Sequence, residues 1–436
     1  MKETRAGISI LVFIISAHIA FLLPQTSQSR NITAGYAPTS CPGPINGARS
    51  TLLLPAEKVP TKYLASLGSD FRKTSTGSFT LSQGAIVIQG DPRNSLEIQS
   101  KAGQWTSGTT CSSGNTESWF VGGNAGVTSQ SKLAIENSGL SDATVELTTF
   151  SENGPSTPTS VTVGAASEKT IRLDALNPGA NKIVTRLRVL SGRVTAFMLD
   201  ERVKGLKNLG ADFVPASPNP SPSVIIGGIP ASIGKDSKAQ ATLRILAPGA
   251  IDGTASVEVI SSNGVFVPVG FSEIALNSQE VVEVPLSNFQ VGSQNFALRI
   301  EASIPIVAGV YVEGKRGSLS DFSWHGALTP FKKSTFNIYG LQPTITFVSK
   351  NISVSAEWSD SRGKVYRSTI KGDEVVNWKV PANVRRIQLV SFTGTSAAMS
   401  WVSGDGLATV GILSNPEISS STRPVAEISV IQPSHS

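Results

Sequence analysis

Histidine is the residue type in this sequence that most often supports acid–base or metal chemistry. The chain has three histidines, His18, His325 and His435. A zinc site or a catalytic triad needs several positioned imidazoles, or one imidazole with a nucleophile and a carboxylate. Only His325 falls inside the folded repeats, four residues after Asp321, and no GxSxG nucleophile elbow accompanies it. We therefore predict no catalytic and no metal site, and a surface or turn position for His325.

Glycines and carboxylates offer no stronger candidate for a cofactor-binding or catalytic site. The Gly-rich stretch Phe120–Gly126 lacks GxGxxG spacing and leads into another strand pattern, whereas phosphate binding needs a helix N-terminus. We expect a turn there and no cofactor. Glu146, Glu258 and Glu357 fall on expected strands, where the solvated face is their ordinary place. A glycosidase would need two acids converging in an aromatic cleft, and aromatic residues make up only 6% of the chain.

Tryptophans and basic residues bear on binding rather than catalysis. The tryptophans are spread through the chain, and we expect them to pack in cores or between domains, with sugar stacking by one or two as the alternative. They are Trp105, Trp119, Trp324, Trp358, Trp378 and Trp401. A patch for anionic polymers could form from Arg202, Lys204, Lys207, Lys332, Lys333, Arg385 and Arg386. Because acidic neighbours accompany these residues, we interpret them as scattered solvated charge and expect no nucleic acid partner at a net charge of +6.

Cysteine usage and the N-terminus indicate export. After Lys2 and Arg5, the 18 residues Ala6–Leu23 carry no charge at neutral pH. As a helix this stretch is about 27 Å long, so both a cleaved signal peptide and a retained membrane anchor fit. Cys41 and Cys111 are the only cysteines and follow this segment. In an oxidising compartment they are expected to form a disulfide, with two free buried thiols as the alternative.

The elements that must position these residues are β-strands. Charged residues make up 16% of the chain, while 40 glycines and 25 prolines give a turn-rich composition. The length of 436 residues predicts two to four domains. We predict an all-β fold of tandem β-sandwich-like (Ig-like) repeats after a single N-terminal hydrophobic helix.

An internal duplication in the sequence supports the prediction of tandem β-sandwich repeats. The segment LAIENSGLSDATVELTTFSENG from Leu133 matches LRILAPGAIDGTASVEVISSNG from Leu243, and each reads as alternating strands around Gly-containing turns. The match continues to Asp212-Phe213 and Asp321-Phe322, so the unit is about a hundred residues long, as in a β-sandwich. A weaker third copy is indicated from near Ile352.

The boundaries follow from these repeats. We predict a signal peptide or anchor at 1–30 and an N-terminal β-rich portion with the disulfide at 31–130. The repeats follow at 131–215, 224–330 and 331–413, with a Pro-rich linker at 216–223 between the first two and a flexible tail at 414–436.

The order of several segments resembles an uncharacterised actinobacterial family of exported, anchor-bearing envelope proteins, classed as a domain of unknown function. The segments run from Cys41-Pro42 through SWFVGG at 118–123 to the IPIVAGVYV strand at 304–312. The resemblance covers roughly residues 41–413. It implies an envelope location and a β-rich fold. The family has no established activity, so the resemblance supplies no catalytic residues to carry over.

We therefore expect an exported, membrane-tethered rod of β-sandwiches with a non-enzymatic scaffold or binding role. The expected partner is a cell-envelope protein or an anionic or glycan polymer. A hydrolase of envelope glycan or peptide and a secreted adhesin are the alternatives.

Overall fold

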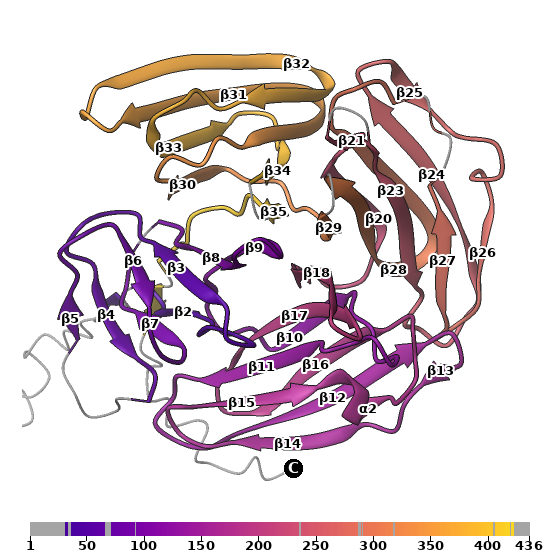
Figure 1. Ribbon diagram of the computed structural model, residues 1–436, viewed down its shortest axis with the longest axis horizontal. Coiled ribbons are helices and arrows are strands. Elements are labelled where there is room, and N and C mark those ends of the chain that lie inside the picture. Colours follow the sequence, from indigo (N-terminus) through magenta and orange to yellow (C-terminus); the bar gives the residue numbers. More distant parts are fainter. Residues whose placement is uncertain are drawn as a thin grey trace, which may run out of the picture. The chain divides into compact units, whose positions relative to one another are not determined.

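The computed structural model describes most of the chain and is built almost entirely from β-strands (Figure 1). The described residues are 31–33, 36–65, 71–91, 93–234, 237–286, 289, 291–316, 319–403, 406–418 and 420–422. Within them the one helix is α2, Leu173–Leu176. The all-β prediction is confirmed, and the predicted N-terminal helix at Ala6–Leu23 lies outside the described residues. No helix in the described part is long and apolar enough to cross a membrane.

The chain divides into two compact units. In one of them, residues 1–35 and 418–436, β1 (Asn31–Thr33) pairs antiparallel with β36 (Ser420–Thr422). Part of the segment predicted to be a flexible tail is therefore a strand, and residues 423–436 lie outside the described part. The other unit, residues 36–417, holds the repeats.

We call residues 117–214 sandwich 2, because they form two sheets whose apolar faces share one core. Alternating residues of its strands, such as Val145 and Leu147, are fully buried, as the period of two predicts. At the predicted Asn-Gly turn, Gly154 takes a φ of 92°, which favours glycine. One sheet runs β13-β12-β16-β10 with β14 beside β12, and the other runs β15-β11-β17-β18. The strands are β10 (Glu117–Val121), β11 (Lys132–Asn137), β12 (Ala143–Ser151), β13 (Gly154–Pro155), β14 (Thr159–Val163), β15 (Ser167–Arg172), β16 (Val184–Ser191), β17 (Thr195–Lys204) and β18 (Lys207–Val214).

Sandwich 3, residues 221–326, repeats this pairing strand for strand and agrees with the predicted duplication. The orders are now β25-β24-β28-β20, with β26 beside β24, and β27-β23-β28-β29. One long strand, β28, serves both sheets where sandwich 2 uses β16 and β17. The strands are β20 (Ser221–Ile229), β21 (Ser232–Gly234), β22 (Ser237–Lys238), β23 (Gln240–Leu246), β24 (Gly253–Ser261), β25 (Gly264–Phe266), β26 (Ile274–Leu276), β27 (Val281–Pro285), β28 (Phe296–Arg316) and β29 (Leu319–Gly326).

Sandwich 4, residues 333–411, is a simplified third copy. The long strands β31 and β32 each span both sheets, and β31 pairs with β33 at one end and with β34 at the other. The copy begins at Lys333, upstream of the match near Ile352. The strands are β30 (Lys333–Asn337), β31 (Thr344–Asp360), β32 (Val365–Lys379), β33 (Val384–Ser391), β34 (Ser396–Val402) and β35 (Leu407–Gly411).

Sandwich 1, residues 39–110, has the same topology, although its sequence gave no sign of a repeat. Its sheets run β2-β7-β4-β5 and β6-β3-β8-β9, so β7 and β8 occupy the places of β16 and β17. The described part of residues 36–417 therefore holds four copies of one sandwich. The strands are β2 (Thr39–Cys41), β3 (Arg49–Leu53), β4 (Pro60–Tyr63), β5 (Arg72–Lys73), β6 (Ser78–Leu81), β7 (Ile86–Ile88), β8 (Leu96–Lys101) and β9 (Trp105–Thr110).

The predicted Pro-rich linker at 216–223 differs from the structure. Residues 216 and 217 form β19 (Ala216–Ser217), which pairs with β10, and β20 begins at Ser221. Pro222 is accommodated because it falls at the register shift between Ser221 and Ser223, where the ladder does not require its missing N–H. The segment therefore joins two sandwiches through paired strands.

The last strand of each sandwich faces the last strands of its neighbours. We call β9, β18, β29 and β35 the inner strands; β18 contacts β9 and β29, and β35 contacts β9 and β29 (Figure 1). Sandwich 1 also bonds directly to sandwich 4, since the side-chain amide of Asn94 donates to Ser334 Oγ at 3.1 Å. A rod would keep the first and last repeats apart, so the expectation of a rod is wrong for residues 36–417.

Candidate functional site

A buried carboxylate ties the inner strands together. Asp321, on β29, is 6% exposed. Its Oδ1 accepts the backbone N–H of Ala211 on β18 at 3.3 Å, and its Oδ2 accepts that of Leu407 on β35 at 2.8 Å. Burial raises the pKa of Asp321 well above its usual range. Backbone hydrogen bonds to the carboxyl, including one from Thr106 on β9, lower the pKa but do not cancel this effect. One side chain of sandwich 3 thus bonds to the inner strands of the other three sandwiches.

Asp212 holds the corresponding position in sandwich 2. It is fully buried; its Oδ1 accepts the Ser107 hydroxyl at 2.6 Å and its Oδ2 the backbone N–H of Trp324 at 2.8 Å. The Ser107 hydroxyl in turn accepts the backbone N–H of Phe213. Burial raises the pKa of Asp212 well above its usual range, and the charge of Asp321 raises it further. The two repeated aspartates therefore form one hydrogen-bonded centre.

Arg202, expected to be solvated, is instead part of this centre. It donates to Asp200 Oδ2 at 2.8 Å, and its guanidinium lies 4.5 Å from the centre of the Tyr311 ring. Asp200 Oδ2 also accepts the indole N–H of Trp324 at 3.0 Å. Arg202 is therefore held between sandwiches 2 and 3 and is not available to an anionic partner.

A cavity of about 120 Å³ lies beside the inner strands. Its wall comes from all four sandwiches, for example Thr109 of sandwich 1, Phe213 of sandwich 2, His325 of sandwich 3 and Thr409 of sandwich 4. None of the described residues that line it is an aspartate, glutamate, lysine or arginine. The cavity therefore suits an uncharged ligand.

His325 is the titratable side chain in that wall. The sequence placed it at a turn or on the surface, but it lies on β29 and is 2% exposed. Its Nε2 is 2.9 Å from Ser323 Oγ, and its Nδ1 has no hydrogen-bond partner among the described residues. Burial lowers the pKa of His325 to about 4, against a smaller raising effect of the Gly227 carbonyl, so the ring is neutral at pH 7.

The contact between Ser323 and His325 has only part of a catalytic arrangement. In a serine hydrolase the second ring nitrogen donates to a carboxylate, and the nucleophile is open to substrate. Here Nδ1 has no carboxylate partner among the described residues, and Ser323 is fully buried. In the same described ranges, no group of three or more His, Cys, Asp or Glu side chains could hold a metal ion.

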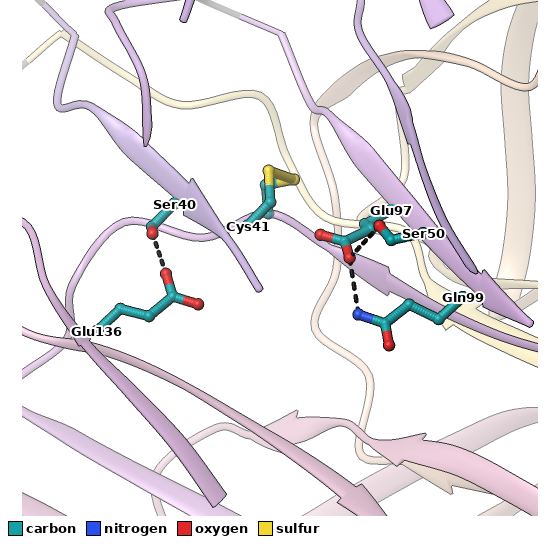
Figure 2. Close-up of a disulfide and its surroundings, with 7 residues drawn as sticks. Ser40, Cys41, Ser50, Glu97, Gln99 and Glu136 are labelled. Carbon is teal, nitrogen blue, oxygen red and sulfur yellow. Dashed lines mark hydrogen bonds between the residues drawn. A yellow bond between two sulfur atoms is a disulfide. The ribbon is translucent and has the colours of Figure 1, made fainter. Parts of the chain in front are cut away.

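The disulfide joins the first strand of sandwich 1, β2, to the residue that follows its last strand, β9. Cys41 and Cys111 are joined with their Cα atoms 4.5 Å apart, in agreement with the prediction from the cysteine count, and both are buried. Figure 2 shows two carboxyls near this bond. Glu97 accepts the Ser50 hydroxyl at 2.6 Å and the Gln99 amide at 2.8 Å.

The second carboxyl beside the disulfide comes from sandwich 2. Glu136, on β11, accepts the hydroxyl of Ser40 on β2 (Figure 2). Burial raises the pKa of Glu97 to about 8 and that of Glu136 well above its usual range. These two carboxyls therefore favour the protonated state in the folded chain.

Tryptophans and other acidic residues lie largely as expected. Trp105, Trp119, Trp324 and Trp401 are buried. Trp358 is half-buried, and its ring centre is 5.9 Å from that of Tyr366. The glutamates expected on solvated faces form ion pairs with neighbouring strands, as Glu146 does with Arg188 at 2.9 Å.

Sequence reasoning missed the residues that build the centre. The repeat alignment brought out Asp212-Phe213 and Asp321-Phe322, but gave them no role. The recurrence of the Asp-Phe pair at the end of each unit was the visible signal, but it does not distinguish a buried aspartate from a solvated one, because aspartate is mostly exposed in proteins. No comparable signal marks Glu97, Glu136 or the cavity wall.

Comparisons with solved structures give distant matches. A crystal structure of protein 1070 from Thermotoga maritima is 11% identical, covers 25% of this chain and 95% of its own, and has a TM-score of 0.21. A tetra-tandem repeat from the extending region of a large adhesion protein is 12% identical, covers 87% of this chain and 95% of its own, and has a TM-score of 0.11. No curated protein matches the chain significantly.

A family model matches residues 90–370, which spans sandwiches 2 and 3 with parts of sandwiches 1 and 4. The matched range contains Asp212, Asp321 and His325. The chain belongs to the family of unknown function DUF5719.

Proposed function

We propose that this chain is an exported cell-envelope protein with a non-enzymatic binding or scaffold role, tethered by its N-terminal segment. The observation that carries the binding role is the cavity, whose wall is built from all four sandwiches and held by the buried aspartates. A rigid wall of this kind pre-organises the groups that contact a ligand, which reduces the entropy lost on binding.

Two features support the extracytoplasmic location. The bond between Cys41 and Cys111 persists in oxidising compartments, and cytosolic reductants would break most such bonds. The apolar segment Ala6–Leu23 follows two basic residues, as in export signals. We infer a cell-envelope protein or a glycan polymer as the partner.

Fractionation tests the tether. Cells that produce the protein would be separated into membrane, wall and medium, and the N-terminal peptide containing Lys2 sought by mass spectrometry. We expect an intact N-terminus in the membrane fraction. A chain in the medium that begins after residue 23 would instead support a secreted adhesin.

Incubation with cell-wall material tests the binding role against hydrolysis. We expect the protein to sediment with the material, or with a partner recovered from it, without releasing fragments. Release of fragments that Ser323→Ala abolishes and Ser112→Ala leaves unchanged would overturn the proposal, because Ser323 contacts His325, whereas the hydroxyl of Ser112, which lines the cavity, donates to the Ser113 carbonyl.

A further inference from the structure

We propose that a second pocket, at the edge of sandwich 1, binds a sugar that carries a carboxylate or a phosphate, with Arg72 holding the anionic group. The inference goes beyond the proposed function, because no described residue lines both this pocket and the cavity beside the inner strands. It assigns a separate site to sandwich 1 and names the chemistry of its ligand.

The pocket lies where the two sheets of sandwich 1 end. Its volume of about 500 Å³ falls within the usual range of small-molecule sites, about 300–1,000 Å³. β5 and β6 are the edge strands of the two sheets, and residues 74–77 connect them. Two backbone bonds hold this connection in place, because Thr74 accepts the N–H of Lys58 at 2.9 Å and donates to the Val59 carbonyl at 3.1 Å. The pocket therefore has a fixed wall at the margin of the sandwich.

The register of the sheet directs Arg72 toward this pocket. Arg72 on β5 lies opposite Thr61 on β4, and residues directly opposite each other in an antiparallel pair share one face of the sheet. Thr61 also lies opposite Ile88 on β7, whose side chain belongs to the core between the two sheets. Arg72 therefore projects to the side on which the pocket lies. Its side chain is exposed, so a solute can reach it, whereas the next residue, Lys73, projects to the opposite face.

The charge of the pocket favours an anion. Arg72 has no acidic partner in the described ranges, and no described residue of the wall is an aspartate or a glutamate. Lys62 and Lys73 add two positive charges beside it. Asp70, which lies outside the described residues, adds one carboxylate to the neighbouring sequence and leaves the bases in excess. Because a guanidinium bonds carboxylates and phosphates through two parallel N–H groups, Arg72 suits either of these anionic groups.

The rest of the wall favours a sugar over a bare ion. Tyr63 and Phe79 line the pocket and are half-buried, so part of each ring remains open to pack against the apolar C–H face of a sugar. Thr74, Ser75 and Thr76 bring hydroxyls to the same wall. The hydroxyls of Thr74 and Thr76 donate to the backbone carbonyls of Val59 and Ser78, and each can still accept a bond from a sugar hydroxyl.

Two adjacent substitutions test the role of Arg72. Arg72→Gln and Lys73→Gln remove the same charge from neighbouring exposed positions, but only Arg72 projects toward the pocket. We expect Arg72→Gln to weaken binding of an anionic sugar by at least about fivefold, and Lys73→Gln to weaken it by less than about twofold. Thermal unfolding of both variants checks that they fold as the wild type does.

The assay is calorimetric titration of the oxidised full-length chain in a detergent without a sugar headgroup. The probes are glucuronate and glucose 6-phosphate, with glucose and inorganic phosphate as controls. We expect at least one anionic sugar to bind at millimolar concentration or below and more tightly than either control, with weaker binding as salt is added. Comparison of the two anionic sugars shows whether the pocket prefers a carboxylate or a phosphate.

Four results would overturn the inference. They are equal binding of glucose and the anionic sugars, equal binding of inorganic phosphate and glucose 6-phosphate, equal losses for Arg72→Gln and Lys73→Gln, and no binding of either anionic sugar. In the last case, sedimentation of the protein with cell-wall material would leave the proposed function standing, and only the assignment of this pocket would fall.

Discussion

Replacing Asp321 with alanine should destabilise the whole assembly of sandwiches. The change removes both acceptors that hold Ala211 on β18 and Leu407 on β35. Asp321 is 6% exposed, so water cannot readily replace the lost bonds. Each backbone N–H left buried without an acceptor costs about 1–3 kcal/mol, which gives roughly 2–6 kcal/mol for the pair.

That loss is large beside the total stability of a folded domain, about 5–15 kcal/mol. Urea unfolding followed by tryptophan fluorescence measures it, because Trp324 and Trp105 lie on inner strands and report on this centre. We expect a lower midpoint, with the disulfide kept oxidised in every sample.

Asp360→Ala is the matched control. Asp360 also accepts two backbone N–H groups, from Arg362 at 2.8 Å and Lys364 at 3.0 Å, but in an exposed turn. Water can replace those bonds, so its midpoint should shift far less. Equal shifts for the two variants, or a wild-type midpoint for Asp321→Ala, would refute the reasoning that burial makes these bonds important.

Three further predictions concern other parts of the fold. Reducing the bond between Cys41 and Cys111, which are 70 residues apart, should lower the free energy of unfolding by about 4 kcal/mol, measured by urea titration with and without reductant; equal midpoints would contradict this. Because burial raises the pKa of Glu97 to about 8, the folded chain binds this proton more tightly than the unfolded chain does. Its contribution to stability is therefore fully present below about pH 4 and is lost as the pH rises through about 8. Melting temperatures across that range should show a shallower decline for Glu97→Gln, and parallel curves would argue against it. Arg244→Ala should destabilise the chain by about 3–5 kcal/mol, since Arg244 is buried and paired with Glu283, and a change below 1 kcal/mol would show that the pair is not needed.

Much of the fold could be predicted because strand periodicity and turn chemistry are local properties. The duplicated strands around Val145 and Val257 were read correctly, since their burial follows an alternation visible in the sequence. The first sandwich was not recognised as a copy, because its strands share pairing order but no sequence pattern with the others. The Pro-rich segment was assigned to a linker on composition alone, although Pro222 lies at a bulge that tolerates it.

The candidate site was much less predictable, because its residues are far apart in the chain. The wall joins Thr109, His325 and Thr409, and no spacing rule relates residues separated by so many positions. His325 was assigned to the surface or a turn, because no nucleophile motif accompanies it in the sequence. Its burial depends on the packing of three other sandwiches around β29.

The sequence by itself determined the all-β class, the duplicated unit and the pairing of the two cysteines, because each depends on local alternation, turn residues or a count. Only the tertiary structure decided that Asp212 and Asp321 meet, that sandwich 1 contacts sandwich 4, and that a neutral cavity forms beside the inner strands. The physical reason is that a buried carboxylate is tolerated only where donors from other strands reach it, and tertiary packing decides which strands those are.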